Sequence, residues 1–323
     1  MLKRIAAICL MMLLCHGCGG KSKEELYAEG LENLKNNNPA AAVVLFKSAL
    51  EKDQNYTDAR YQLAKSFSEQ GKTEQAEKEF LKVLAQNPSR EEVNLDVARL
   101  YNGSKRPEEA FKLAEAYLAK HPEHAESLEI MGISCAVRNL YADAESYLKR
   151  AIQADPANQK FPLELAGVYV AAGDEGKART LLDGVITADA KNVKPYYMLA
   201  SLDQRAGKSA AALDRYRKIT EISRSETQAT YRAGLIHISA NELDKADVLA
   251  EGMIKEFPKR ADGYRLKGIV QYHRKQYPEA MASLQNAQKM AATLDTFYYL
   301  GLSAYQKGEL EGALSHFRKI LDH

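Results

Sequence analysis

The sequence predicts an all-α fold built from about nine stacked helix-turn-helix units. Two series of small residues, here called columns, recur every 34 residues, and the last step in each is 33 residues. A fixed period of this length is typical of repeat proteins. The columns lie twelve residues apart, one in each helix of a unit, where a large side chain would hold the helices apart. The first column consists of Gly30, Ala64, Ala98, Gly132, Ala166, Ala200, Gly234, Gly268 and Gly301. The second consists of Ala42, Ala76, Ala110, Ala144, Ala178, Ala212, Ala246, Ala280 and Ala313.

Turn residues and prolines divide each unit into two helices. Seven residues after each member of the first column lies a residue type that accepts a left-handed backbone, except at Lys105 and Lys275. Prolines stop four of the second helices. The turn residues are Asn37, Gly71, Asn139, Gly173, Gly207, Asn241 and Gly308, and the prolines are Pro88, Pro122, Pro156 and Pro258. Two helices of about 14 residues cannot bury their apolar faces alone, so each pair must stack on the next. The predicted repeats are 23–56, 57–90, 91–124, 125–158, 159–192, 193–226, 227–260, 261–293 and 294–323.

The first residues have the pattern of an export signal. Lys3 and Arg4 form a basic start, and the apolar run over residues 5–14 is too short to span a bilayer as a helix. The segment Leu13-Leu14-Cys15-His16-Gly17-Cys18 resembles a bacterial lipoprotein signal. We therefore expect a signal peptide over residues 1–17, lipidation at Cys18, and a short tether over residues 18–22.

Lipidation of Cys18 would tether the chain to a membrane without spanning it. Each buried methylene contributes about 0.8 kcal/mol, and two or more acyl chains hold a protein where one does not. Lipidation at Cys15 and an ordinary secretory signal without a lipid are the two alternatives. Gly19 stands where Asp commonly signals retention in the inner membrane, so the resemblance implies the periplasmic face of the outer membrane.

Composition and charge exclude several classes of protein. Apolar residues make up 46% of the 323 residues and charged residues 27%, which suits a folded chain. The 45 Lys and Arg balance 43 Asp and Glu, so the chain lacks the basic field that gathers nucleic acid, and we expect no nucleic-acid partner. After the signal, no run approaches the roughly 20 apolar residues of a transmembrane helix.

The chain offers no recognisable catalytic or metal-binding motif. Cys135 would remain alone after processing, so no disulfide framework is available and we interpret this residue as a small apolar helix residue. His121 and His124 lie in a loop and are interpreted as solvated turn residues. Because no nucleophile stands in an activating context either, we expect no metal, no cofactor and no enzymatic activity.

The repeat pattern over about residues 23–323 resembles the tetratricopeptide repeat (TPR). The motif is clear in Leu63-Ala64, Phe67, Gly71, Ala76, Phe80 and Pro88, whereas Pro162 and Thr230 replace the large aromatic that often opens the first helix. The resemblance implies a right-handed superhelical solenoid of about nine units, whose first helices line a concave face with positions two, five, nine and twelve pointing inward.

Tyr and Arg at these inward positions form a candidate partner-binding groove in repeats six to nine. Both side chains bury a large area and keep a polar tip, and both are enriched at binding hot spots. Packing between neighbouring helices is the alternative role for each tyrosine. The candidate groove residues are Tyr197, Tyr231, Arg265, Tyr272, Tyr298 and Tyr305.

A closer resemblance concerns the lipoprotein signal together with the segments Tyr61-Gln62-Leu63-Ala64-Lys65 and Gln75-Ala76-Glu77-Lys78-Glu79-Phe80. This combination resembles the TPR lipoprotein of bacterial PEP-CTERM/exosortase systems, which accompany exopolysaccharide gene clusters. It implies a periplasmic, membrane-anchored scaffold for a protein partner in exopolysaccharide export or protein sorting. The alternatives are direct binding of the polysaccharide through the tyrosines and an accessory role in pilus or outer-membrane protein assembly.

The last predicted repeat leaves apolar residues without a polar capping helix. Terminal repeats usually need such a cap, and Phe317, Ile320 and Leu321 lack one. We expect that this end either packs on a partner or continues into a longer array.

Overall fold

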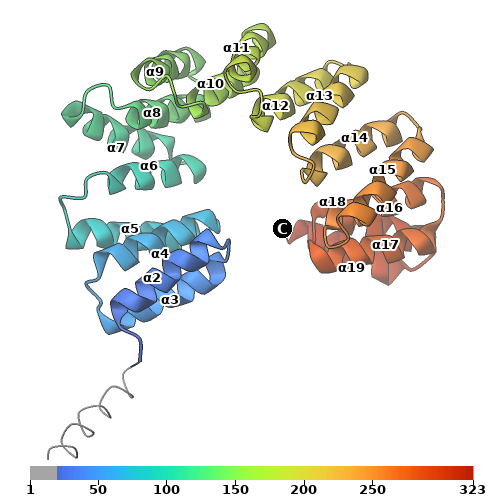
Figure 1. The fold of residues 1–323 in the computed structure, drawn as a ribbon, viewed down its shortest axis with the longest axis horizontal. Coiled ribbons are helices and arrows are strands. Elements are labelled where there is room, and N and C mark those ends of the chain that lie inside the picture. Colours follow the sequence, from blue (N-terminus) through green and yellow to red (C-terminus); the bar gives the residue numbers. More distant parts are fainter. Residues whose placement is uncertain (1–19, 323) are drawn as a thin grey trace, which may run out of the picture. The chain divides into compact units, whose positions relative to one another are not determined.

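Antiparallel helical pairs make up the described part of the chain. The computed structural model describes residues 20–322, which contain eighteen α-helices and no β-strand (Figure 1). The first helices of the repeats are α2 (Lys23–Lys35), α4 (Thr57–Glu69), α6 (Val93–Gly103), α8 (Ala125–Val137), α10 (Lys160–Ala171), α12 (Val193–Arg205), α14 (Thr227–Ser239), α16 (Ala261–His273) and α18 (Leu294–Gln306). The second helices are α3 (Pro39–Lys52), α5 (Thr73–Gln86), α7 (Pro107–Lys120), α9 (Tyr141–Ala154), α11 (Glu175–Ala188), α13 (Ser209–Ile222), α15 (Leu243–Glu256), α17 (Tyr277–Met290) and α19 (Leu310–Leu321). The predicted all-α fold of stacked helix-turn-helix units is confirmed.

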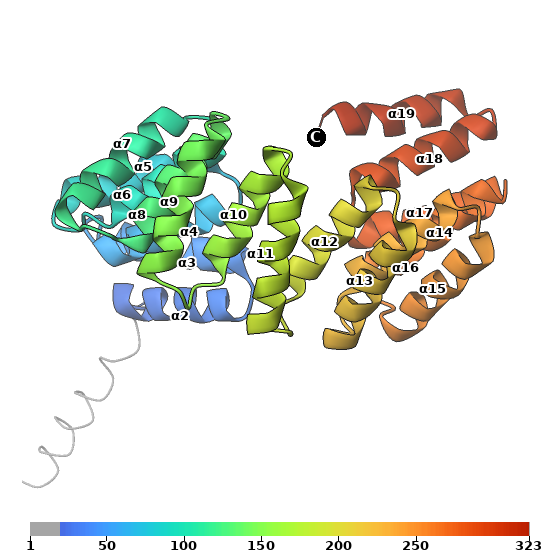
Figure 2. The ribbon, with the colours of Figure 1, turned by 90° about the horizontal axis from the view of Figure 1, so that it is seen from above.

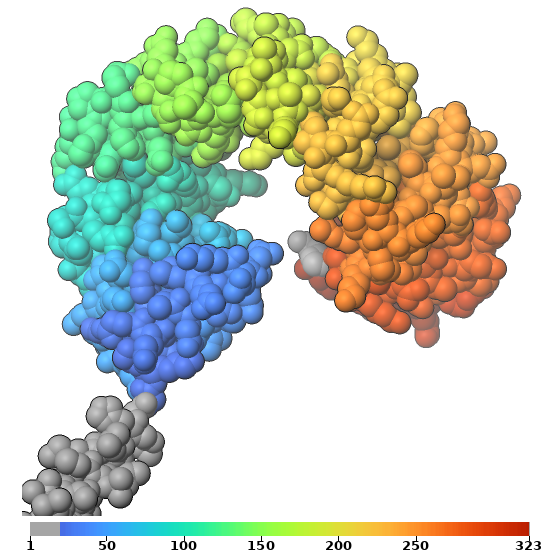
Figure 3. Space-filling model, viewed as in Figure 1, coloured from blue at the N-terminus to red at the C-terminus, as the bar shows by residue number. Residues whose placement is uncertain are grey.

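The helices belong to two compact units that divide after Val168, within α10. From α2 to α9 in unit 1, and from α11 to α19 in unit 2, each helix packs against the next helix in the chain. In unit 2, α14 lies beside α15 and α16 beside α17 (Figure 2). In unit 1 the successive pairs form a continuous packed surface, coloured from blue to green in Figure 3. Some consecutive first helices also touch, namely α6 with α8, α14 with α16, and α16 with α18.

The turn inside each repeat uses one left-handed residue. At all nine turn positions φ lies between 56° and 81°, including 59° at Lys105 and 62° at Lys275. A left-handed backbone is unfavourable by about 1–2 kcal/mol for a residue with a Cβ atom, whereas glycine adopts it freely. The two lysines that depart from the sequence pattern therefore adopt the same turn as the glycines, at a cost in conformational energy.

The two columns of small residues lie where helices approach each other closely. All eighteen of these residues are buried, and each alanine of the second column is at most 3% exposed. A methyl group added to Gly268 would come within 2.5 Å of Leu284 on α17, and one added to Gly301 within 2.6 Å of Phe317 on α19. Both neighbours belong to the second helix of the same repeat. A larger residue at these positions would force the helices of a pair apart.

Repeat seven lacks the large side chain that other repeats bury at the start of the first helix. Tyr196 of α12 and Phe297 of α18 are each 5% exposed, and the equivalent residue of α14 is Thr230. A hollow of about 350 Å³ lies beside Thr230 and is lined also by Tyr216 of α13 and Leu249 of α15. This departure from the pattern does not change the fold, since α14 still packs on both α15 and α16.

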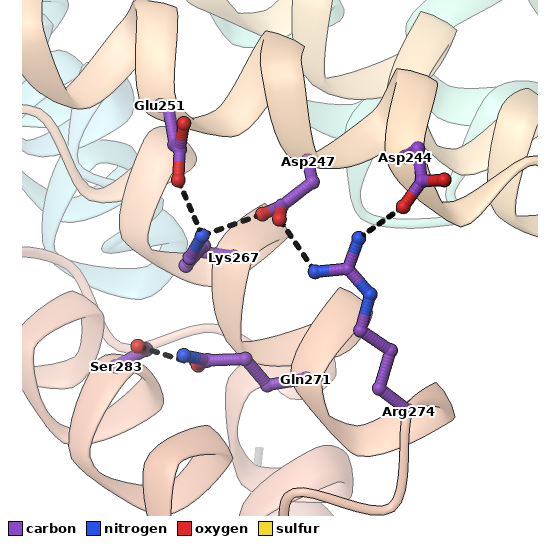
Figure 4. A network of polar contacts seen from close by, with 7 residues as sticks. All are labelled: Asp244, Asp247, Glu251, Lys267, Gln271, Arg274 and Ser283. Carbon is purple, nitrogen blue, oxygen red and sulfur yellow. Dashed lines mark hydrogen bonds and ion pairs between the residues drawn. The ribbon is translucent and has the colours of Figure 1, made fainter.

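Charged side chains join α15 and α16 in unit 2 (Figure 4). Asp247 of α15 accepts hydrogen bonds from Lys267 at 2.7 Å and from Arg274 at 2.5 Å, both of which follow from the stacking of α16 on α15. Burial alone would raise the pKa of Asp247, but the bonds from Lys267 and Arg274 outweigh it and lower that pKa. Lys267 also donates to Glu251, and Arg274 to Asp244, while a separate hydrogen bond joins Ser283 of α17 to Gln271 of α16.

Substitution of Lys275 by glycine should raise the free energy of unfolding by about 0.5–1 kcal/mol, because it removes the cost of a left-handed lysine. The rise would be measured by scanning calorimetry. Asn241→Gly is the matched control at the same turn position of repeat seven, and it should give a smaller gain, since Asn tolerates this backbone. Equal gains in the two variants would contradict the argument.

The Asp247→Asn variant should lower the free energy of unfolding by about 1–3 kcal/mol, because Lys267 and Arg274 both lose the negative charge and one of them loses its acceptor atom. Asp244→Asn is the control: its side chain is 99% exposed although it also pairs with Arg274, so the change should stay within about 0.5 kcal/mol. The pKa of Asp247 is lower in the folded chain than in the unfolded chain. The ionised carboxylate therefore adds its full contribution to the free energy of unfolding above about pH 4, and this contribution is lost as the pH falls through the lowered pKa. Denaturation at several pH values would show the difference between wild type and Asp247→Asn shrinking in acid; a difference that grows in acid would refute the assignment.

Candidate binding surfaces

Position five of the repeat mostly lies in the seam between neighbouring first helices. Tyr231 is 2% exposed and Arg265 is 5% exposed, although the sequence placed both on an open groove. The reason is geometric, because α14 packs on α16 and α16 packs on α18, so a side chain at this position points into the next repeat. Tyr231 and Arg265 therefore act as packing residues, and they offer almost no surface to a partner.

Tyr231 and Arg265 hold repeats seven, eight and nine together. The Tyr231 hydroxyl donates to Asp295 of α18 at 2.9 Å, and the Arg265 guanidinium lies over the Tyr231 ring at 5.2 Å. Arg265 also donates to Thr296 at 3.2 Å. Burial raises the pKa of Tyr231 far above its usual value, and the Asp295 carboxylate raises it further. The phenol stays protonated and keeps its role as donor.

Tyr197 of α12 is partly buried in the same way. Its hydroxyl donates to Glu226 at 3.3 Å, and its ring packs on Tyr216 with the ring centres 6.1 Å apart. Burial, assisted by the charge of Glu226, raises the pKa of Tyr197 to about 12. Tyr197 therefore packs between helices and still exposes part of its side chain to solvent.

An aromatic cluster lies where α16, α17 and α18 meet, and we call Tyr272, Tyr277, Tyr298 and Tyr299 the tyrosine cluster. The ring of Tyr272 lies 5.8 Å from Tyr277 and 5.4 Å from Tyr299, and Tyr298 lies 5.4 Å from Tyr299. Tyr298 is 48% exposed, so part of the cluster is open to solvent. A set of tyrosine rings held by mutual contact and partly open to solvent has the character of an interface hot spot.

Further exposed apolar side chains surround this end of unit 2. Tyr305 of α18 is 58% exposed, and Leu310, Leu314 and Leu321 of α19 are 63%, 50% and 86% exposed. Within the described residues no helix packs on this side of α19. Exposed apolar patches of this kind mark interaction surfaces.

The first helices of unit 1 carry a polar inner face instead of an aromatic one. The Tyr61 hydroxyl donates to Asp96 at 2.9 Å, and Arg99 pairs with Glu126 at 2.6 Å. These residues come from α4, α6 and α8, so the contacts link three consecutive repeats. Tyr61, at position five, again bridges to the next repeat.

The remaining candidate residues play no part in these surfaces. Cys18, together with the predicted signal peptide, lies outside the described residues. Cys135 is buried, and burial raises the pKa of its thiol. His124 is more than a solvated turn residue, because its Nδ1 accepts from the Ser127 amide and caps α8. Among residues 20–322 no cluster of His, Cys, Asp and Glu is arranged to bind a metal, and no helix is long and apolar enough to cross a membrane.

Sequence reasoning missed two features of the surface. Tyr299 lies at position six, outside the inward positions, yet it joins Tyr272 and Tyr298 into one cluster. Glu129 of α8 is only 5% exposed, although glutamate is rarely buried. The sequence did contain a signal for Glu129, because this glutamate lies at position five, where the other repeats carry mainly Tyr and Leu.

Comparison with protein families gives a consistent match. A model described as tetratricopeptide repeat matches residues 33–100, 69–131 and 138–202, and a second model of the same description matches residues 295–323. The first model alone covers just over half of the chain. The mouse Superkiller complex protein 3 is 33% identical over 92 residues, which are 27% of this chain and 6% of that protein, so the chain spans a small part of its relative.

Three solved structures share the fold. A tetratricopeptide repeat protein from Parabacteroides merdae has a TM-score of 0.52 at 17% identity, with 91% of this chain and 100% of that chain covered. Yeast Tom70 has a TM-score of 0.54 at 13% identity, with 92% and 84% covered. PilW, a type IV pilus biogenesis factor, has a TM-score of 0.53 at 20% identity, with 63% and 94% covered. At these identities the likeness concerns the fold alone.

Proposed function

Because the chain belongs to the tetratricopeptide repeat family, we propose that it is a scaffold that binds a protein partner in the bacterial envelope, anchored to a membrane by a lipid on Cys18. Proteins of this family generally act by holding other proteins, and the stacked pairs provide an extended surface for that purpose. The lipoprotein-like segment that ends at Cys18 supports the anchor and a location on the periplasmic face of the outer membrane.

The tyrosine cluster is the observation that carries the proposal. It combines rings that are fixed by mutual contact with the exposed side chain of Tyr298, and Tyr305 of the same helix is exposed as well. Rigid aromatic side chains lose little conformational entropy when a partner covers them, so each buried contact contributes strongly to affinity. We place the partner site at this end of unit 2.

The resemblance to TPR lipoproteins of PEP-CTERM/exosortase systems supports a role in exopolysaccharide export or in sorting proteins to the cell surface. A second candidate is an accessory role in pilus or outer-membrane protein assembly, for which the shared fold of PilW, a type IV pilus biogenesis factor, is a precedent. Direct binding of an exported polysaccharide is the third, since exposed tyrosine rings can also stack on sugars.

A photo-crosslinking amino acid at position 305 should capture a protein in cells, because Tyr305 is 58% exposed and lies on α18 about two turns beyond Tyr298. Tyr298→Ala together with Tyr305→Ala should reduce the affinity for the captured partner by about tenfold or more, as expected for hot-spot residues. Val248→Ala is the control, since Val248 is 69% exposed on α15, outside the cluster. An adduct that resists protease but not glycosidase would favour the polysaccharide, and unchanged affinity in the double variant would exclude the cluster.

Radiolabelled palmitate should enter the wild-type chain in cells, and Cys18→Ser should abolish the label. Cys15→Ser is the matched control, which should remain labelled. Labelling that persists in Cys18→Ser and disappears in Cys15→Ser would move the anchor to Cys15.

A further inference from the structure

An open pocket of about 320 Å³ lies among the first helices of unit 1, away from the tyrosine cluster. It lies between α6, α8 and α10, and residues at inward positions of three consecutive repeats line it. Its walls combine charge with apolar surface. The charged residues are Arg99, Glu129, Lys160 and Glu164, and the apolar ones include Ile130 and Ile133.

Glu129 is the unusual member of this pocket. Its side chain is 6% exposed, and a carboxylate removed from water needs partners for both oxygens. Oε1 lies 2.7 Å from the Lys160 ammonium group, whereas Oε2 has no hydrogen-bond partner among the described residues. The carboxylate is therefore only half satisfied, and it can accept a further donor.

Lys160 is suited to leave this carboxylate. Its side chain is 47% exposed on a flexible stem, so its ammonium group can return to water when another cation takes its place beside Glu129. It also stands in the first turn of α10, where a positive charge is unfavourable next to the helix dipole. Lys160 thus acts as an exchangeable partner for Glu129.

The other cation of the pocket is already engaged. Arg99 lies 2.6 Å from Glu126 and 3.4 Å from Asp96. It therefore has little remaining attraction for an anionic ligand.

The surrounding inner face favours a cationic ligand. Position two carries an exposed carboxylate in four successive repeats. Asp58 and Glu92 share Arg90, and Glu126 shares Arg99 with Asp96, so each arginine leaves one negative charge uncompensated. Complementary charge steers a partner and fixes its register even where single pairs add little affinity. These carboxylates are Glu24, Asp58, Glu92 and Glu126.

We propose that this pocket receives a lysine side chain of the protein partner, whose ammonium group replaces that of Lys160 beside Glu129. The alkyl stem of the incoming lysine would lie along Ile133, and its ammonium group, which is not tethered to α10, would use its three N–H donors to contact both carboxylate oxygens. The proposal rests on the proposed function, because it names a feature of the partner that the scaffold holds.

Fluorescence anisotropy of the full chain with labelled tetralysine tests the proposal directly. Lys160→Met should tighten binding about fivefold, because the internal competitor is removed. Lys112→Met removes an equal charge from α7, outside the pocket, and should change the dissociation constant less than about twofold. Equal effects of the two variants, or tighter binding of tetraglutamate than of tetralysine, would overturn the proposal.

Glu129→Gln gives the opposite effect, since it removes the charge and nearly conserves the shape. Tetralysine binding should weaken about tenfold, whereas Glu115→Gln on the exposed part of α7 should leave it nearly unchanged. Thermal unfolding checks that Glu129→Gln is folded, and the Lys160→Met result decides the matter if it is not. Capture of a partner at position 305 does not depend on tetralysine binding, so the failure of this inference and the failure of the proposed function give different results.

Discussion

The close approach of neighbouring helices is the constraint on which the rest of the structure depends. Glycine and alanine in two columns let each first helix lie directly on its second helix, with no space even for one methyl group at Gly268 or Gly301. Dense packing of this kind transmits any change in side-chain volume to the neighbouring repeat. The period of 34 residues exists because every repeat must satisfy the same constraint in the same place.

This constraint also decides which side chains remain available for binding. Where first helices touch, the residue at position five is drawn into the seam, as with Tyr231 between α14 and its neighbours. A hollow also lies beside α6, α8 and α10, and charged residues such as Glu129 and Lys160 line it. The two units consequently present different chemistry, aromatic in the tyrosine cluster of unit 2 and ionic on the inner face of unit 1.

The sequence was sufficient for the fold but only partly for the site. Helical pairs follow from local features, and even the turn at Lys275 could be placed from the spacing alone. Exposure does not follow from spacing, because it depends on how far one repeat overlaps the next. Position five of the repeat is therefore occupied both by Tyr231, which is buried against α18, and by Tyr298, which is half exposed.

The hydrogen bond from Tyr231 to Asp295 joins repeat seven to repeat nine and passes over repeat eight. The stability of a repeat array is approximately the sum of its units and their nearest-neighbour contacts, so that such arrays fray one unit at a time. A bond between second neighbours breaks this rule. Detaching repeat nine would break this bond and leave the buried Tyr231 hydroxyl without its acceptor, at a cost of about 1–3 kcal/mol, so the bond opposes fraying of the last repeat and keeps it docked on its neighbours.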